Sequence, residues 1–231
     1  MKKYILIGFM SLLLFSACDI LKELEIPVYG TVTEGDIING LKEALKIGTE
    51  NGISSLNQQD GFYGNPLFRI PFPEEAKYVE EKLRALGFNK MIDDFILTLN
   101  RGAEKAVKKA SPIFLDAITN MSFSDARTIL NGKEDEATRY FHSKTNDQLI
   151  VAFKPDVQTT LDQVHVTSYW DDITTAYNKI PFTKKVETDL AQYVTEKTVD
   201  GLFIRIAQEE KLIREDPKAR VTEILRKVFG Q

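Results

Sequence analysis

The chain has 231 residues, of which 30 are basic and 34 acidic, and a formal net charge of −4 at pH 7. This length suits one domain, and a mildly acidic chain lacks the basic face that nucleic-acid binding requires. Cys18 is the only cysteine, and His142 and His165 are the only histidines. These counts exclude an internal disulfide and a multi-histidine zinc site, so we expect no metal and no cofactor.

The first 17 residues have the layout of a secretory signal peptide. Lys2 and Lys3 supply positive charge, and Tyr4 to Ala17 form a run of fourteen residues without a charge. This run is shorter than the roughly 20 apolar residues that cross a bilayer. Leu14-Phe15-Ser16-Ala17-Cys18 resembles the bacterial lipobox, with Phe15 where an aliphatic residue is usual. We predict cleavage before Cys18 and lipid on this cysteine; the alternative is an ordinary secretory signal with a coincidental cysteine.

The predicted domain organisation follows from this leader. Residues 1–17 form the cleaved signal peptide, and residues 18–32, which contain Pro27 and Gly30, form a lipidated N-terminus and tether. Residues 33–231 form the domain. Loss of Lys2 and Lys3 changes the net charge from −4 to −6. We expect an exported domain in the bacterial cell envelope, held on a membrane through its N-terminal lipid.

Helical periodicity begins at Thr33, where Thr33 and Asp36 resemble a capping box. Apolar residues then recur at three-to-four spacing up to Gly48. Turn-forming residues break this pattern between Gly52 and Pro73, where we expect a long ordered loop or a very short extended pair. An antiparallel helix pair follows, with a stop at Gly87 and apolar positions at Val79, Leu83, Leu86, Ile92, Phe95, Ile96, Leu99, Ala103 and Ala106.

The second half of the chain continues the helical pattern. Ser111-Pro112 and Ser122 with Asp125 predict two helix starts. Further helices are expected over 137–164 (kinked by Pro155), 169–180 (ended by Pro181), 190–213 and 219–229. The sequence therefore predicts an all-α fold, a single antiparallel multi-helix domain of about eight helices without a significant sheet.

Several stretches carry a wider resemblance: Leu41-Lys42-Glu43-Ala44-Leu45, Asp60-Gly61-Phe62, Asn65-Pro66, Asn100-Arg101-Gly102-Ala103-Glu104, Ala137-Thr138-Arg139-Tyr140-Phe141, Tyr193-Val194-Thr195, Asp200-Gly201-Leu202-Phe203 and the tail from Glu209 to Gly230. Over roughly residues 33–230 the chain resembles the bacterial family known as domain of unknown function 4197 (DUF4197). The resemblance implies a single helical envelope domain, commonly behind a lipoprotein or secretory leader. It implies no established activity or ligand.

The Asp60–Pro73 loop is the main candidate site, because long loops inside compact domains often carry function. Our hypothesis for a pocket, if one exists, is that this loop covers it and that Asn100, Arg101 and Glu104, about one helical turn apart, line one wall. The candidate pocket residues are Asp60, Phe62, Asn65, Asn100, Arg101 and Glu104. Two simpler interpretations remain open. The apolar loop residues Phe62, Phe68, Ile70 and Phe72 can plug the end of the bundle, and Arg101 with Glu104 can form an exposed ion pair.

Other polar and aromatic groups have simpler explanations. Arg205 with Glu209 and Glu210 with Arg214 have the spacing of i,i+4 pairs on a solvated helix face. A series of aromatic residues can be core or a stacking platform: Tyr169, Trp170, Tyr177 and Phe182. We expect both histidines at a helix surface or at the edge of the core.

No nucleophile motif or glycine-rich phosphate loop occurs. We therefore expect a non-catalytic binding or interaction protein whose partner is an envelope protein or a small ligand, and no nucleic acid. Two alternatives are an enzyme of unrecognised type, for example a hydrolase with its site under the 60–73 loop, and a structural or assembly lipoprotein without a small-molecule site.

Overall fold

The computed structural model describes residues 33–163, 170–171, 174–175, 178–179, 185 and 189–215 of the chain. Contacts divide the chain into two units, Met1–Thr33 and Glu34–Gln231. All the helices named below belong to the second unit. The predicted signal peptide, Cys18 and the whole predicted tether (residues 18–32) lie outside the described residues.

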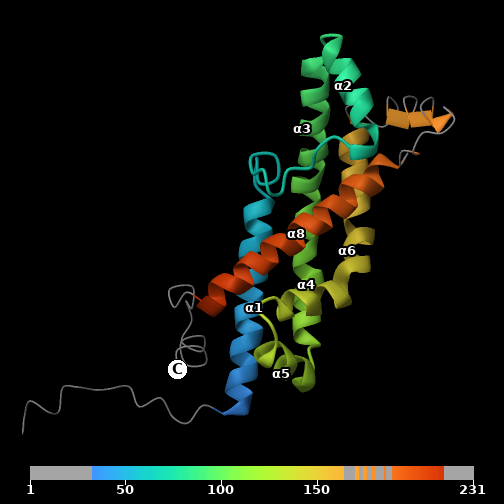
Figure 1. The fold of residues 1–231 in the computed structure, drawn as a ribbon. Coiled ribbons are helices and arrows are strands. Elements are labelled where there is room, and N and C mark those ends of the chain that lie inside the picture. Colours follow the sequence, from blue (N-terminus) through green and yellow to red (C-terminus); the bar gives the residue numbers. More distant parts are fainter. Residues whose placement is uncertain are drawn as a thin grey trace, which may run out of the picture. The chain divides into compact units, whose positions relative to one another are not determined.

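Most of the described residues lie in helices (Figure 1), namely α1 Glu34–Leu56, η2 Glu74–Ala76, α2 Lys77–Ala85, α3 Asn89–Ala106, η3 Val107–Lys109, α4 Ala110–Thr119, α5 Phe123–Asn131, α6 Glu136–Asp162 and α8 Leu190–Glu215. No strand occurs within these ranges, so the predicted all-α class is confirmed. The described residues hold fewer helices than the eight expected. The helix predicted at 219–229 lies outside them, as does half of the predicted 169–180 segment.

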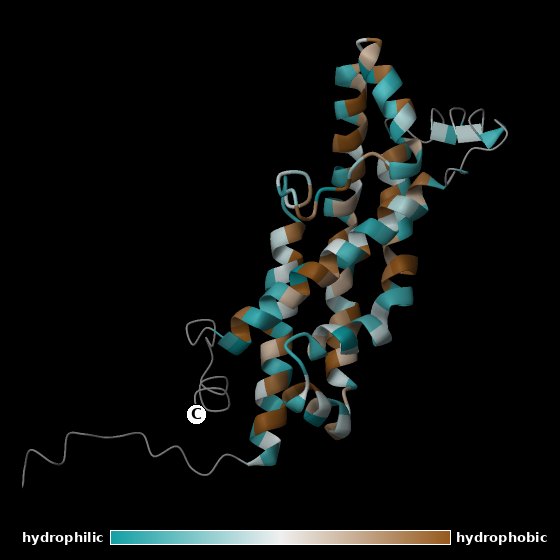
Figure 2. Cartoon of the chain, in the orientation of Figure 1, coloured by the Kyte–Doolittle hydropathy of each residue, from teal (hydrophilic) through white to brown (hydrophobic). Residues whose placement is uncertain are grey.

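The core forms where α1, α3, α4, α6 and α8 pack together. Helix α8 crosses α1, α3 and α6 obliquely (Figure 1). Brown apolar residues recur between teal polar ones along these helices (Figure 2), as an amphipathic pattern requires. The side chains completely removed from solvent include Leu99, Phe114, Phe141, Phe153 and Leu202. Each such burial stabilises the fold by about 1.5–3 kcal/mol.

Helix α1 is longer than the sequence pattern predicted. The expected break at Gly52 is wrong, because the helix continues to Leu56 and the loop begins at Asn57. Gly52 faces α8: a Cβ atom there would lie 3.0 Å from Cδ1 of Ile206. The glycine allows α1 and α8 to approach closely, and the lost helix propensity is offset by this packing.

The hairpin of α2 and α3 confirms the stop predicted at Gly87. This residue has φ +93°, a left-handed conformation that glycine adopts without the steric cost of a Cβ. In α3 the predicted apolar positions Ile92, Ile96, Leu99, Ala103 and Ala106 are buried. Phe95 is partly buried and packs against the same core.

The helix start predicted at Ser111-Pro112 is wrong. Helix α4 begins at Ala110, and the 3-10 turn η3 joins it to α3. Pro112 therefore lies in the first turn, where backbone amides have no intrahelical acceptor and a missing N–H costs little. Proline at this place is compatible with a helix that began earlier.

The predicted start at Ser122 is confirmed. Ser122 is the N-cap of α5, and the hydroxyl of Ser122 and the carboxylate of Asp125 form a reciprocal capping box. The helix ends at Asn131, and Gly132 is its C-cap. Helix α6 runs through Pro155 to Asp162, and α8 covers the predicted 190–213 range.

Candidate functional site

The loop from Asn57 to Pro73 connects α1 with η2. Its apolar side chains Phe62, Phe68, Ile70 and Phe72 are all buried. Phe62 packs against α8, since a Cβ atom on Gly201 would lie only 2.9 Å from its Cε1. These side chains support the interpretation that the loop plugs the bundle.

Asn100 of α3 holds the second half of this loop. Its side chain is 0% exposed. The Oδ1 atom accepts a hydrogen bond from the Ile70 amide at 2.8 Å, and Nδ2 donates to the Ile70 carbonyl at 2.9 Å. Nδ2 also donates to the carbonyl of Ile96 at 2.7 Å. The amide of Asn100 thus satisfies both backbone groups of a buried loop residue, which would otherwise be costly to bury.

Glu104, one turn further along α3, holds the first half of the loop. It is 5% exposed, and its Oε1 accepts hydrogen bonds from the amides of Phe62 and Tyr63, each at 3.2 Å. Its Oε2 pairs with Nη1 of Arg101 at 2.5 Å. The predicted Arg101–Glu104 pair therefore exists, but the expectation that it is exposed is wrong. The loop covers the carboxylate and uses it as a backbone acceptor.

Arg101 links this buried carboxylate to the surface. Its Nη2 donates to Oδ1 of Asp60 at 2.7 Å, and the Asp60 side chain is 51% exposed. Burial opposes the charge on Arg101, but hydrogen bonds and charges from Glu104 and Asp60 outweigh it, so the pKa of Arg101 is raised. The guanidinium stays charged at every physiological pH.

Asn65 does not join the other predicted pocket residues. It is exposed, and its Oδ1 accepts a hydrogen bond from the Leu67 amide at 3.0 Å. This local contact is typical of an asparagine that stabilises a turn. Asp60, Phe62, Arg101 and Glu104 therefore share one cluster. Asn100 holds the neighbouring Ile70, and Asn65 lies on the outer side of the loop.

Sequence reasoning did not single out two residues on this loop, Tyr63 and Arg69. The guanidinium carbon of Arg69 lies 4.4 Å from the centre of the Tyr63 ring, and that of Arg101 lies 5.9 Å from it. Arg69 is exposed and Tyr63 half-buried. The exposure of Arg69 could have been predicted from the alternation Phe68-Arg69-Ile70, in which neighbouring side chains point in opposite directions and two of the three are apolar.

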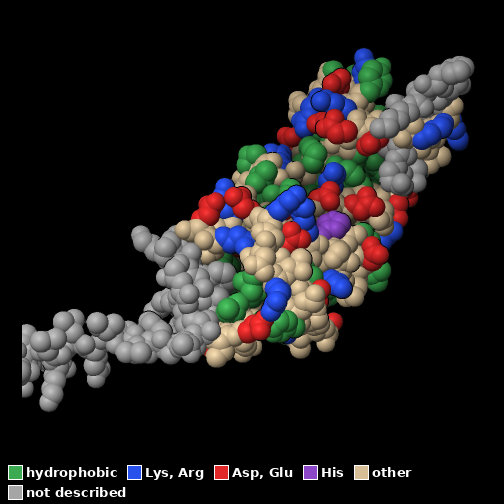
Figure 3. Space-filling view, turned by 60° about the horizontal axis from the view of Figure 1, so that its bottom comes forward, with side chains coloured by type: hydrophobic (Ala, Val, Ile, Leu, Met, Phe, Trp, Pro, Cys, Tyr) green, Lys and Arg blue, Asp and Glu red, His purple; other side chains and the backbone are tan. Residues whose placement is uncertain are grey.

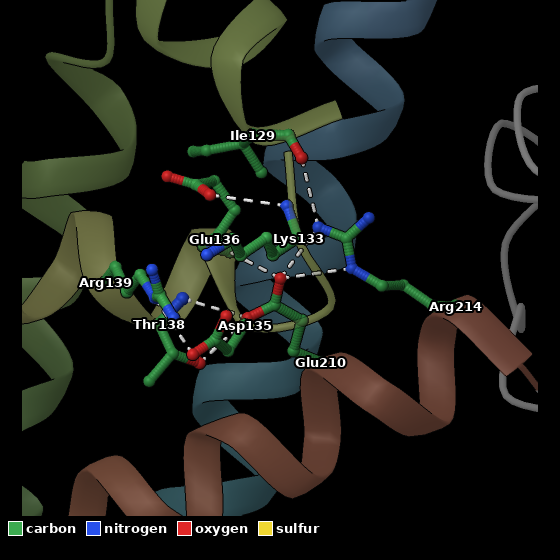
Figure 4. Close-up of polar contacts among 9 residues, drawn as sticks. Ile129, Lys133, Asp135, Glu136, Thr138, Arg139, Glu210 and Arg214 are labelled. Carbon is green, nitrogen blue, oxygen red and sulfur yellow. Dashed lines mark hydrogen bonds and ion pairs between the residues drawn. The ribbon is translucent and has the colours of Figure 1, made fainter. Parts of the chain in front are cut away.

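A second buried carboxylate, Glu210 of α8, lies at the start of α6 (Figure 4). It accepts hydrogen bonds from the amides of Ala137 and Thr138 at 3.0 and 2.9 Å, and from the Thr138 hydroxyl at 2.8 Å. Arg214 pairs with it at 2.7 Å and also donates to the carbonyl of Ile129 at 3.1 Å. This cluster joins α8, α6 and the end of α5.

Glu209 is buried as well, on the α1 side of α8. It pairs with Arg205, which also donates to the hydroxyl of Ser55 at 2.9 Å and to the side chain of Gln208 at 3.0 Å. Glu209 and Glu210 are 6% and 7% exposed. The two i,i+4 pairs were predicted correctly, but the solvated helix face is wrong, because neighbouring helices cover both carboxylates.

The remaining sequence candidates are core or surface groups. Trp170 is buried against Phe72 and Phe95, with ring centres 5.6 and 5.7 Å away. The other aromatic residues of its series lie outside the described residues, namely Tyr169, Tyr177 and Phe182. His142 is exposed and its ring centre lies 4.8 Å from that of Phe203, whereas His165 lies outside the described residues.

The part of the chain that the structure describes contains no group of three or more His, Cys, Asp or Glu residues that could hold a metal ion. Within the same ranges, no helix combines the length and apolar character needed to cross a membrane. Side chains of both charge signs are interspersed on the face shown in Figure 3.

The comparisons with known proteins give one match. A family model described as a protein of unknown function, DUF4197, matches residues 31–230. No curated protein and no solved structure matches the chain. The match covers all the clusters described above.

Proposed function

The chain belongs to the DUF4197 family of proteins of unknown function, and from that premise we propose that it is a bacterial envelope lipoprotein. In this proposal Cys18 carries the lipid, and the exported helical domain binds a partner without catalysing a reaction.

The leader is the observation that carries the proposed anchor. A basic start and an uncharged run precede Ser16-Ala17-Cys18, and this cysteine is the only one in the chain. Acyl chains contribute about 0.8 kcal/mol of membrane affinity per buried methylene, so several chains on Cys18 would hold the protein firmly. The domain then needs no membrane span of its own.

The buried carboxylates support a non-catalytic role. A general acid or base must be able to exchange a proton with a bound substrate. Glu104, Glu209 and Glu210 instead form ion pairs with arginines on their own helices, and two of them also accept hydrogen bonds from backbone amides. Charged groups used in this way stabilise the arrangement of helices and loops.

The test of the anchor is the intact mass of the protein extracted from membranes. We expect the mass of residues 18–231 plus acyl chains. Cys18→Ser should abolish the acyl mass and release the protein from the membrane. Ser16→Ala keeps a small residue before the cysteine and should leave the acylated mass unchanged. An unmodified mass for the parent chain in the soluble fraction would overturn the proposal.

A further inference from the structure

Arg69 and Tyr63 present two unused hydrogen-bond donors at the surface of the loop. Within the described part of the chain, Arg69 has no carboxylate partner; its contact is the Tyr63 ring, 4.4 Å from its guanidinium carbon. The Tyr63 hydroxyl likewise has no hydrogen-bond partner among the described residues. A stacked guanidinium keeps its planar fork of N–H groups free at the edge, in a geometry that matches an oxyanion.

The backbone beneath these two side chains is held from inside the protein. The Tyr63 amide donates to the buried carboxylate of Glu104, and Ile70, next to Arg69, is held by both polar atoms of Asn100. Because these contacts are made before any ligand arrives, the ordering of the loop does not oppose binding. Both donors are therefore preorganised.

The local charges favour a singly charged ligand. Arg101 lies 5.9 Å from the Tyr63 ring and is already paired with Asp60 and Glu104, so Arg69 is the arginine of this cluster that has no carboxylate partner among the described residues. The two arginines and the two carboxylates together carry no net charge. The half-exposed Asp60 would repel a second negative charge. A carboxylate carries one charge and accepts two parallel hydrogen bonds from guanidinium, whereas a phosphate group carries about −1.5 to −2.

We propose that Arg69 and Tyr63 form a recognition site for a carboxylate of an acidic peptide segment in a partner protein. Leu67, which is 54% exposed on the same loop, offers an apolar contact for the residues beside that carboxylate. This inference rests on the proposed binding function and names its site and the class of its partner.

The test titrates the mature lipid-bearing protein, in a non-ionic detergent at low salt, with a peptide that carries one glutamate among neutral residues and has both ends blocked; isothermal titration calorimetry measures the binding. Arg69→Ala should weaken binding about tenfold, the loss of a charged hydrogen-bonding group of about 1.4 kcal/mol. The affinity of Arg69→Lys should lie between those of the parent chain and Arg69→Ala, because lysine keeps the charge but lacks the planar fork of N–H groups. Tyr63→Phe keeps the ring and should weaken binding about threefold through loss of the hydroxyl, about 0.7 kcal/mol.

Arg139→Ala is the matched control, since it removes another exposed arginine and changes the net charge equally. Equal weakening by Arg139→Ala and Arg69→Ala would overturn the proposal and assign the binding to general electrostatics. Binding of inorganic phosphate but not of the glutamate peptide would also overturn it. Neither result affects the acyl mass on Cys18, so failure of the carboxylate site and failure of the lipid anchor can be told apart.

Discussion

Two regions of the molecule, the 57–73 loop and the junction between α5 and α6, are each held by a buried glutamate from another helix. Glu104 accepts hydrogen bonds from the amides of Phe62 and Tyr63, and Glu210 accepts them from Ala137 and Thr138. Each glutamate also pairs with an arginine on its own helix. In both regions, therefore, a carboxylate that is paired with an arginine accepts hydrogen bonds from two consecutive backbone amides.

The two regions differ in what the device supports. Glu210 lies at the N-terminus of α6, where the helix dipole adds to the attraction, and Arg214 also donates a hydrogen bond to a backbone carbonyl of α5. At the loop, Arg101 also pairs with the half-exposed Asp60, and the anchored backbone presents Tyr63 and Arg69 to solvent. Glu210 therefore contributes mainly to the stability of the fold, whereas Glu104 determines the shape of a surface loop.

The largest expected effect is that of Glu210→Ala. It removes the acceptor of two backbone amides and the ion pair between Glu210 and Arg214, so we expect a loss of about 3–5 kcal/mol in the free energy of unfolding. Urea denaturation followed by circular dichroism measures this loss. Glu215→Ala, on the exposed end of α8, should change stability by less than about 0.5 kcal/mol. A loss below about 1 kcal/mol for Glu210→Ala would contradict this account.

Glu104→Ala should cost less, about 2–3 kcal/mol, because Arg101 is closer to solvent and keeps Asp60 as a partner. The same variant should expose the loop to proteolysis, since the amides of Phe62 and Tyr63 lose their acceptor. Limited proteolysis with mass mapping detects the cleavage. Asp60→Asn removes only the charge that pairs with Arg101 and keeps a side chain that tolerates the φ of 65° at this position, so it should cost at most about 1 kcal/mol, without new cleavage. If both variants behave alike, the carboxylate of Glu104 does not hold the loop.

Gly201→Ala tests whether Phe62 is tightly held against α8. The added methyl would meet Cε1 of Phe62 at 2.9 Å. Overpacking of about 1–3 kcal/mol should exceed the gain in helix propensity of about 1 kcal/mol, for a net loss near 1 kcal/mol. Gly102→Ala is the control, because the nearest neighbour of its methyl lies at 3.7 Å. It should be neutral or stabilising by up to about 1 kcal/mol, and a stabilising Gly201→Ala would show that Phe62 can move.

The smallest effect is expected at the N-terminus of α5. Here the carboxylate that accepts the hydrogen bonds is Asp125 of the same helix, not a glutamate from a distant helix. Hydrogen bonds from the hydroxyl and the amide of Ser122 lower the pKa of Asp125. Its contribution to stability is therefore complete above the unfolded pKa of about 3.9 and is lost as the pH falls through the lower folded pKa. Ser122→Ala should cost about 1 kcal/mol at pH 7 and reduce the loss of stability on acidification. Thermal denaturation between pH 2 and 6 measures both; an unchanged acid dependence would contradict the capping role.

Much of the fold could be predicted because its signals are local. The capping box at Ser122, the left-handed turn at Gly87 and the apolar spacing of α3 act within one or two helical turns. One error arose where a distant helix decides the outcome. Gly52 resembles a helix breaker until α8 is placed against it. The error at Pro112 is a local one, because the 3-10 turn η3 directly before it joins α4 to α3.

The candidate site shows the same division. Sequence alone identified Asn100, Arg101 and Glu104 and the correct i,i+3 and i,i+4 ion pairs, because spacing along a helix determines which side chains can meet. It could not show that Glu104, Glu209 and Glu210 are buried, or that Asn100 holds Ile70, because these facts depend on segments 30 or more residues away. An ion pair has the same spacing in water and in the core; only the packing of other helices and loops over it decides where it lies.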